Sequence, residues 1–516
     1  MPLIQRLLIF LVSWLYFFAA EAQSPGAPVL TFGEDGIARL AVAEGKWAQI
    51  IPRRGGGYLG LMTGDHETRL IALTADGIPD VSWASEGQLQ LPSRAACRLM
   101  TAAPDGGVYI GGTITSSTGK DLMVLHLLPE GTLDPDFGQG GMTAIAIPGQ
   151  TEGVMLETDD EGRIWVAGHT FERDWESRNF MMTRLMPDGR PDPDFGQKGV
   201  AIIDIGKYDL CRAAAADPRG GWILAGTTRT GSFSEVCILR VSARGQLDKT
   251  FGQGGYVRLD PGLEHNFCEA LALQRDGMIY LMGHTKRQKG PAGVDWMLVR
   301  LRPDGVPDPT FGQEGMVFWD LGGVDYACGL TIQPDGYLVL AGTSNQRLRL
   351  LRTDTQGQPD PAYGIDGWVS SEVQLQTAGC MRLADESLMV WGATTGHPLV
   401  AQFRGNPSLP GVYDLLQAAD TAAATRIHLR LCAGIRLRVS LTTPPAPGPG
   451  ARMAPAAWER HIVFVHDTYG RMDWIWTDQH RVMMYHNGHY THTAEGITWP
   501  RPAQLPDSVW VGEARN

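Results

Sequence analysis

The chain has 516 residues, a formal net charge of −12 and 64 glycines. Abundant glycine with only 19% charged residues favours short strands joined by tight turns over a mainly helical protein. Ten arginines and nine acidic residues nearly cancel from Ser408 onward, so the negative charge lies on the part before it. An acidic body without a basic stripe argues against nucleic acid as a partner, because phosphate neutralisation dominates that affinity.

The first 22 residues predict a signal peptide. Arg6 gives a positive start, residues 7–20 are apolar, and Ala20-Glu21-Ala22 has the small-x-small form that a signal peptidase cleaves. The apolar run of about 14 residues is short for a bilayer span of about 20, although an uncleaved anchor stays open as an alternative. We therefore expect a mature chain that begins at Gln23 and is secreted or periplasmic. No later stretch is long and apolar enough to predict a transmembrane segment.

An internal repeat is the strongest signal in the body of the chain. A turn of the Phe-Gly type recurs, with its aromatic residue at seven positions 51 to 60 residues apart: Phe32, Trp83, Phe137, Phe195, Phe251, Phe311 and Tyr363. A chain of this length would ordinarily suggest about three domains, but stacked repeats bury one continuous core. Seven copies at this period predict a propeller or a solenoid.

The repeat over 268–319 shows what one unit contains. It has four short apolar runs, separated by turns rich in Gly, Pro and Asp: 268–273, 278–283, 295–301 and 315–319. Runs of this length between turn residues are strand signals. Four antiparallel strands in one such repeat make a unit of the size of a propeller blade.

The two ends of the repeat region predict that the ring closes. Residues 36–42 supply a fourth strand without the other three, whereas the last repeat supplies three strands, through 388–393 and 399–404, and lacks a fourth. Pairing these ends completes a seventh blade and removes the free edges, for which a linear solenoid gives no reason. We predict an all-β chain with a seven-bladed β-propeller of four-stranded blades over 23–407, closed by the N-terminal strand.

Recurrent residues within the repeat have mechanical interpretations. Glycine after aspartate in the turns permits positive φ, and the turn aromatic should plug the core between blades. Aspartates near the turns are expected to cap turn amides: Asp134, Asp136, Asp192, Asp194, Asp248 and Asp308. The pairs 134/136 and 192/194 could also suggest calcium, but neither has a full twelve-residue loop ending in Glu, so capping is preferred.

The ordered pattern resembles the delta-60 repeat. It consists of Asp-Gly, an apolar strand, Ala-Gly-Thr, a loop, a strand ending in Arg-Leu, then Pro-Asp-Gly and Leu-Asp before the Phe-Gly turn. Examples are Arg300-Leu301, Pro303-Asp304-Gly305, Asp308 to Gly312, Pro334-Asp335-Gly336 and 338–343. The resemblance covers about 29–407, with weak first and second copies. It implies a bacterial exported protein with an NHL-like propeller, and almost no chemistry.

Five cysteines fall at the start of the first strand of their repeats: Cys97, Cys211, Cys268, Cys328 and Cys380. If that strand is innermost, they form a partial ring near one mouth of the channel. A soft-metal or redox ring is one interpretation, and a small buried residue that packs between blades is the preferred one. We expect no disulfides, because equivalent strands of adjacent blades should lie beyond the Cα separation of about 7 Å that a bridge tolerates.

Polar and aromatic residues flank the same strand starts and are the candidate ligand-binding residues: Arg98, Tyr208, Asp209, Arg212, His265, Glu269, Asp325 and Tyr326. Rings that stack and charges that fix orientation suit a sugar or a peptide, although an ordinary solvated loop surface is the alternative. The sequence has no nucleophile elbow, P-loop or His-Glu-x-x-His motif. We therefore predict no catalytic residue and no cofactor.

After Arg404 the repeat stops. Residues 408–441 predict a short helix and a β-hairpin of 426–431 with 435–441, and residues 442–455 a linker rich in Pro, Ala and Gly. Residues 456–516 predict a small β-rich C-terminal module, with strands expected at 461–465, 472–476, 482–485 and 489–493.

Three histidines of this module straddle a probable Asn-Gly turn: His486, His489 and His492. Imidazoles brought together across a hairpin could bind zinc or copper. Side chains three apart on a strand point to opposite faces, however, so only two of the three would converge. A tryptophan platform for a carbohydrate or peptide, and a module without a ligand, stay open.

Together these features predict an exported binding or scaffold protein that recognises a macromolecule or glycan at the cell envelope. The alternative is a hydrolase or lyase acting at the channel mouth. An enzyme would need, beside the ligand residues, a buried acid or base with a shifted pKa. The sequence names neither the partner nor the oligomeric state.

Overall fold

The computed structural model forms two units, residues 1–405 and 406–516, which are treated separately. In the first unit it describes residues 25–40, 45–64, 67–92, 95–116, 119–172, 177–229, 231–260, 265–286, 293–374, 378–384, 387–394 and 397–405. In the second unit it describes strand segments of the backbone between 413 and 513. The predicted signal peptide lies outside the described residues.

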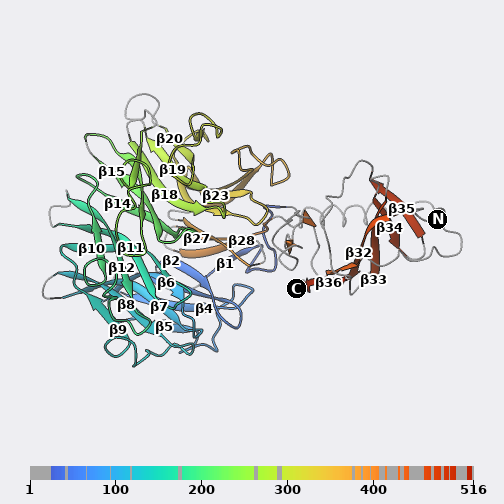
Figure 1. The fold of residues 1–516 in the computed structure, drawn as a ribbon. Helices are drawn as coiled ribbons and strands as arrows, with labels where there is room; N and C mark the ends of the chain where they lie inside the picture. The colour runs from blue at the N-terminus through green and yellow to red at the C-terminus, as the bar shows by residue number, and fades with distance from the viewer. Residues whose placement is uncertain are drawn as a thin grey trace. The chain divides into compact units, whose positions relative to one another are not determined.

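The first unit is a ring of seven four-stranded antiparallel sheets (Figure 1), as the repeat predicts. Blade 1 contains β2 (Lys46–Pro52), β3 (Tyr58–Thr63), β4 (Thr68–Leu73) and β5 (Gln88–Gln90). Blade 2 contains β6 (Ala95–Ala102), β7 (Val108–Thr115), β8 (Lys120–Leu127) and β9 (Met142–Ile145). Blade 3 contains β10 (Gln150–Thr158), β11 (Ile164–Phe171), β12 (Arg178–Leu185) and β13 (Val200–Ile203).

The remaining blades follow the same order. Blade 4 contains β14 (Leu210–Ala216), β15 (Trp222–Thr228), β16 (Glu235–Val241) and β17 (Tyr256–Leu259). Blade 5 contains β18 (His265–Leu273), β19 (Ile279–Lys286), β20 (Val294–Leu301) and β21 (Met316–Trp319). Blade 6 contains β22 (Asp325–Ile332), β23 (Leu338–Ser344), β24 (Arg347–Thr353) and β25 (Trp368–Gln374). From blade 1 round to blade 7 the first strands of successive blades contact one another, so they are the innermost strands of the ring.

The seventh blade closes the ring with both ends of the repeat region. It joins β26 (Ala378–Arg382), β27 (Leu388–Thr394) and β28 (His397–Phe403) to β1 (Ile37–Arg39), which comes from the other end of the unit. In β1, Ile37 pairs with Ala401, and the Val29 N–H donates to the Gln402 carbonyl at 2.8 Å. The predicted closure is confirmed, with a strand shorter than the expected 36–42. The hydrogen-bonded pairing of β1 with β28 therefore completes the seventh blade and closes the ring.

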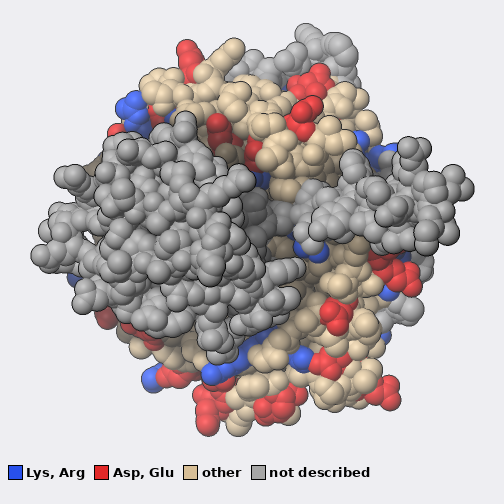
Figure 2. Space-filling model, turned by 90° about the vertical axis from the view of Figure 1, so that its right-hand side faces the viewer, with Lys and Arg blue, Asp and Glu red and all other residues tan. Residues whose placement is uncertain are grey.

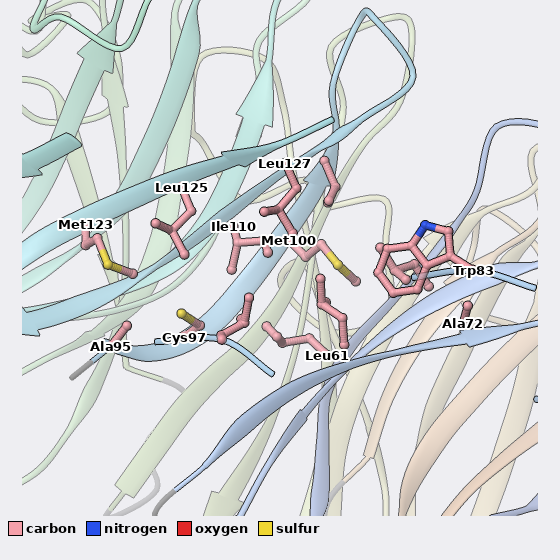
Figure 3. Close-up of a cluster of buried hydrophobic side chains, with 14 residues drawn as sticks. Leu61, Ala72, Trp83, Ala95, Cys97, Met100, Ile110, Met123, Leu125 and Leu127 are labelled. Carbon is pink, nitrogen blue, oxygen red and sulfur yellow. The ribbon is translucent and has the colours of Figure 1, made fainter. Parts of the chain in front are cut away.

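Apolar side chains from adjacent blades fill the space between them. Figure 3 shows this for blades 1 and 2, where Leu61 and Ala72 of one blade meet Cys97, Met100 and Leu125 of the next. Each of these five side chains is at most 1% exposed. Burial of about 25 cal/mol per Å² of apolar surface at every such joint is the main stabilising contribution to the ring.

The aromatic residue of each Phe-Gly turn is the plug that the sequence predicts. All seven aromatics are buried, at 0 to 8% exposure, and each lies against a glycine in a turn of the next repeat along the ring. A methyl group on Gly305, for example, would lie 2.8 Å from Phe251 Cζ, and one on Gly357 would lie 3.0 Å from Phe311 Cζ. The turn glycine is therefore required twice, for its positive φ of 87° at Gly305 and for the space that the ring occupies.

Aspartates of the turns cap amides as expected, and they also hold arginine. Asp134, Asp192, Asp248 and Asp308 accept N–H hydrogen bonds from the residue two positions on at 2.9 to 3.0 Å. Asp136 and Asp194 are expected from the sequence to cap as well, but in these turns they instead donate their own backbone N–H groups to the side chains of Asp134 and Asp192. The second oxygen of Asp308 meets Arg300 at 2.9 Å, which the sequence pattern does not predict.

The second unit is a six-stranded antiparallel sheet in the order β35-β34-β33-β32-β31-β36, with a separate β29–β30 pair. Its strands are β29 (Tyr413–Asp414), β30 (His428–Leu429), β31 (Ile435–Ser440), β32 (Trp458–His466), β33 (Gly470–Thr477), β34 (Val482–His486), β35 (His489–Ala494) and β36 (Ser508–Glu513). Four of them coincide with the strands expected after 456. β31 pairs with β32 and β36, a partnership that differs from the hairpin expected with 426–431. The helix expected near the start of 408–441 is not seen where that segment is described, because Tyr413–Asp414 forms the strand β29 paired with β30. The rest of the expected helix and the linker fall outside the described residues.

The contact between plug and turn glycine predicts unequal effects of two alanine substitutions. Gly305→Ala and Gly254→Ala both place a side chain at positive φ, which costs about 1–2 kcal/mol. Only Gly305→Ala also drives a methyl group into Phe251, since nothing lies within 4 Å of the corresponding position at Gly254. We expect Gly305→Ala to lower the free energy of unfolding by about 1–3 kcal/mol more, measured by urea denaturation. Equal losses would show that the plug does not constrain this turn.

Candidate ligand-binding site on the inner strands

A β-bulge interrupts six of the seven inner strands at equivalent positions. In blade 4, for instance, Cys211 pairs with Gly226 and Ala213 pairs with Ala225, so Arg212 has no partner across the sheet. The bulged residues of blades 1 to 6 are Ala48, Arg98, Val154, Arg212, Glu269 and Cys328. A bulge re-aims the side chain of the extra residue, and three of these six residues are charged.

The glycine of the Ala-Gly-Thr motif makes room for the bulge. A methyl group at Gly226 would lie 2.0 Å from the Leu210 carbonyl oxygen, and one at Gly283 would lie 1.8 Å from that of Phe267. The inner strand thus folds closely over the second strand at the point where its extra residue is inserted. In blades 2 to 6 the motif that identifies the repeat thus gives the bulged strand room to pass, although blade 1 forms the same bulge opposite Met62.

The charged residues at the bulges join others to form an inner-strand cluster, which consists of Arg98, Glu152, His169, Arg212, Glu269 and His284. In its first half, Arg98 Nη1 lies 3.2 Å from Glu152 Oε1, and Glu152 Oε2 lies 3.8 Å from His169 Nε2. In the second half, Arg212 Nε lies 3.6 Å from Glu269 Oε2, and Glu269 Oε1 lies 4.0 Å from His284 Nδ1. Four consecutive blades, 2 to 5, contribute to the cluster.

The arginine side chains of the cluster are exposed to solvent, whereas its histidine side chains are buried. The side chains of Arg98 and Arg212 are 68% and 44% exposed, whereas those of His169 and His284 are 2% and 11% exposed. A ligand could therefore approach the guanidinium groups from solvent and reach imidazoles that are shielded from it.

Burial and positive neighbours keep both imidazoles uncharged at neutral pH. Burial, together with the positive charges of Arg178 and Arg212, lowers the pKa of His169 to about 3. Burial likewise lowers the pKa of His284 to about 4, again with a contribution from Arg212. The Arg178 Nη1 group donates to His169 Nε2 at 3.0 Å, which requires this nitrogen to be unprotonated.

Glu269 is shifted in the opposite direction. Burial raises the pKa of its carboxyl group, although the Arg212 guanidinium opposes the shift. The cluster thus places Glu269, whose pKa is raised above that of an ordinary carboxyl group, beside His284, whose pKa is lowered below that of an ordinary imidazole. This is the type of shifted acid and base that the enzyme alternative requires.

A row of rings continues from the cluster into blade 6. His284 stacks on Phe267 with centroids 5.1 Å apart and meets the edge of Tyr326 at 5.1 Å. His265 extends the row beyond Phe267. Its ring stacks on Phe267 with centroids 6.2 Å apart and meets Phe233 edge-on at 5.7 Å. Tyr326 is 48% and Phe233 is 49% exposed, so both ends of this aromatic row face solvent.

The remaining predicted site residues lie beside this region. Tyr208 lies between two guanidinium groups, 4.8 Å from Arg178 and 5.1 Å from Arg229. Asp209 is fully buried and accepts hydrogen bonds from Thr228 Oγ1 and from the N–H groups of 205 and 206, so it holds the loop before β14. Asp325 is also fully buried, at the start of β22. The structure therefore brings Arg98, Arg212, Glu269, His265 and Tyr326 to the cluster and the aromatic row.

Sequence reasoning missed Glu152, His169 and His284. A signal for the histidines is present, because His replaces Thr in the Ala-Gly-Thr motif at 167–170 and 282–285, whereas 225–227 and 341–343 keep Thr. His169 and His284 occupy equivalent positions in blades 3 and 5. They therefore lie on either side of blade 4, which carries Arg212.

The cysteines are packing residues with protonated thiols. Six described cysteines are free, and Cys97, Cys211 and Cys268 are at most 1% exposed. Burial raises the pKa of Cys97 and Cys211 to about 12, which disfavours the thiolate that metal binding and redox chemistry need. Cys328 departs from the expected ring position, since it occupies the bulge where Glu269 stands in blade 5.

The predicted histidine metal site lies outside the side chains that the structure describes. At the level of the backbone, β34 and β35 form the expected hairpin, with His486 opposite His489 and His492 opposite Met483. The zinc or copper hypothesis stays a prediction.

Comparisons with known proteins support a β-propeller repeat. A family described as domain of unknown function (DUF5122) beta-propeller matches residues 274–311 and 333–363, within blades 5 and 6. No curated protein matches the chain. The delta-60 and NHL names remain a resemblance.

Solved structures with a similar fold include two lyases that cover most of the propeller. A streptogramin B lyase has a TM-score of 0.40 at 11% identity, covering 70% of this chain and 95% of its own. The polysaccharide lyase Uly1 has a TM-score of 0.45 at 8% identity, covering 69% of this chain and 89% of its own. At this distance the likeness carries no argument about activity, and the fold assignment rests on the strand pairing of the chain itself.

The electrostatic arrangement predicts what removal of Arg212 does. A positive charge beside His284 disfavours its protonated form, so Arg212→Met should raise the pKa of His284 from about 4 toward its ordinary value of 6.5. The same substitution should raise the pKa of Glu269 further, because the cation that favours its ionised form is lost. NMR titration of the histidine ring signals, assigned with His284→Gln, measures the shift.

Arg190→Met is the matched control, since Arg190 is an exposed turn residue paired with Asp188. The same titration of His284 in Arg190→Met should follow the wild type. An unchanged His284 pKa in Arg212→Met would show that this guanidinium does not control the cluster.

Proposed function

We propose that this is an exported binding protein whose propeller recognises a glycan at the inner-strand cluster and the aromatic row. The observation that carries the proposal is the gathering of guanidinium, carboxyl and imidazole groups from four blades beside solvent-facing rings. Charged groups that fix orientation next to apolar ring faces are the usual composition of a small-ligand site.

The balance of charge favours a glycan that carries carboxylates. Around the cluster and Tyr208, four guanidinium groups (Arg98, Arg178, Arg212 and Arg229) lie near the carboxyl groups of Glu152, Glu269 and the buried Asp209, while the aspartates at 295, 320 and 325 lie beside Tyr326. Guanidinium groups bind carboxylates with two parallel hydrogen bonds, whereas neutral imidazoles and carboxyl groups bind hydroxyls. Tyr326 offers an exposed ring face on which a sugar ring can stack.

The surface gives no support to nucleic acid as the partner. Figure 2 shows basic and acidic side chains scattered among other residues on one face, where the described residues form no continuous basic stripe. The described residues also include no helix able to span a bilayer. Export by a signal peptide cleaved after Ala22 is part of the proposal, and N-terminal sequencing of the protein from an exporting bacterial host tests it.

Titration calorimetry of the purified protein with uronate-containing and neutral oligosaccharides tests the binding proposal. We expect binding of the acidic set, with affinity lowered about tenfold by Arg212→Met through loss of about 1.4 kcal/mol. Tyr326→Ala should weaken acidic and neutral sugars alike, since it removes stacking. Arg190→Met should bind as the wild type does, and binding that no cluster variant alters would place the site elsewhere.

Lyase or hydrolase chemistry is the second candidate, because Glu269 and His284 form an acid–base pair with 4.0 Å between Oε1 and Nδ1. In this case His284 accepts the proton removed from the substrate, Glu269 is placed to pass a proton to the leaving oxygen, and Arg212 holds a sugar carboxylate. The same oligosaccharides are assayed for new unsaturated ends and new reducing ends.

His284→Gln separates the two candidates. For an enzyme this variant should abolish turnover and keep most of the binding, whereas a pure binding protein shows binding without products in wild type and variant. Products formed equally by wild type and His284→Gln would exclude this imidazole as the base.

A further inference from the structure

Three aspartates converge where blades 5 and 6 meet. Asp295 lies near the start of β20, Asp320 directly follows β21, and Asp325 begins β22 of the next blade. One carboxylate oxygen from each residue lies within 4.8 Å of the other two. A bridge between Val294 and Val324 fixes the backbone of the two blades beside them.

Asp325 makes this more than a cluster of surface acids. Its side chain is fully buried, and while Oδ2 accepts the Leu321 N–H at 2.7 Å, Oδ1 has no hydrogen-bond partner. An unpaired carboxylate oxygen away from water is destabilising, and more so when it is charged. The two further carboxylates converging on it add repulsion that no hydrogen-bond donor to Oδ1 offsets.

The equivalent position at two preceding junctions of the ring carries a fully hydrogen-bonded carboxylate in one case and a neutral amide in the other. Asp209, two residues before the bulge partner Cys211, receives Thr228 Oγ1 on Oδ1 and two backbone N–H groups on Oδ2. In blade 5 the equivalent residue, two before Cys268, is the neutral Asn266. Of these three junctions, only the last has a buried carboxylate with an unpaired oxygen, and two more acids converge on this carboxylate.

We propose that Asp295, Asp320 and Asp325 bind a divalent cation, with Ca²⁺ as the preferred ion. Hard carboxylate oxygens are its usual ligands, at about 2.3–2.6 Å, so oxygens on opposite sides of one ion lie about 5 Å apart or closer. The spacing of the three oxygens fits this limit without rearrangement. The ion joins the end of blade 5 to the first residue of blade 6, directly beside Tyr326 of the aromatic row.

Terbium luminescence reports on this site because tryptophans adjoin two of the three ligands. Trp296 and Trp319 follow and precede the ligands 295 and 320 in sequence, and their rings lie 5.7 and 6.5 Å from that of Trp368. Tb³⁺ bound to the full-length protein should show emission sensitised by tryptophan, and Ca²⁺ should displace it. Ca²⁺ should also raise the Tm in a concentration-dependent way, more than Mg²⁺ does.

Two substitutions test the ligands. Asp325→Asn gives this position the side chain that blade 5 carries at Asn266, and Asp320→Asn changes an exposed residue, so at least one variant should keep the fold, checked by circular dichroism. We expect each to weaken Ca²⁺ binding by about tenfold or more, because the ligand charge falls by one. Asp276→Asn, in an exposed turn of blade 5, is the control for a charge change that removes no ligand.

Two results would overturn the proposal. One is a wild type that shows neither calcium-displaceable terbium emission nor a rise in Tm with Ca²⁺. The other is Ca²⁺ binding that both ligand variants retain at wild-type strength, which would place the ion at another site.

Discussion

The joint between neighbouring blades is the interaction on which the rest of this structure depends. At each joint an aromatic ring from one repeat lies against the turn glycine of the next, as Phe251 does against Gly305. The Gly252 N–H donates to the Asp304 carbonyl at 2.8 Å, and Arg240 stacks over Phe251 while donating to the Pro303 carbonyl. Packing, backbone hydrogen bonding and a cation–π contact thus coincide at one short turn.

These joints hold the inner strands in place, while the amino acid at the bulge differs from blade to blade in blades 1 to 6. The inner strand is held by its neighbours in the ring and by the second strand of its own blade, where a glycine such as Gly226 lets the backbone pass closely. The bulge residue has no partner in the ladder, and its side chain packs against the joint as an apolar residue in Ala48 and Val154 but forms a charged pair across the joint in Arg212 and Glu269. Arg212 and Glu269 can therefore hold partly exposed charges on a rigid backbone, which spares a ligand the entropy cost of ordering them.

The sequence predicts the ring well because its signals are local and repeated. Seven aromatic turns and the split fourth strand determine the blade number and the closure, and buried Cys211 and Cys268 behave as small packing residues. The site is harder to predict because the extra residue of each bulge, such as Glu269, breaks the strict alternation of faces along the inner strand. The pairing of Arg212 with Glu269 joins two blades, and no spacing rule within one repeat reveals it.

The chemistry of this protein lies where its repeats differ from one another. Identical repeats would present equal side chains at the six bulges, but the chain places Arg98, Arg212 and Glu269 there in three blades and Ala48, Val154 and Cys328 in the other three. His169 and His284 replace threonine in only two blades, and these two flank the blade that carries Arg212. Arg212 and Glu269 pair across the joint between blades 4 and 5, and the buried His169 accepts a hydrogen bond from Arg178, so these departures from the repeat depend on one another. The fold does not require them, because blades without these charged and titratable groups form the same four-stranded sheet.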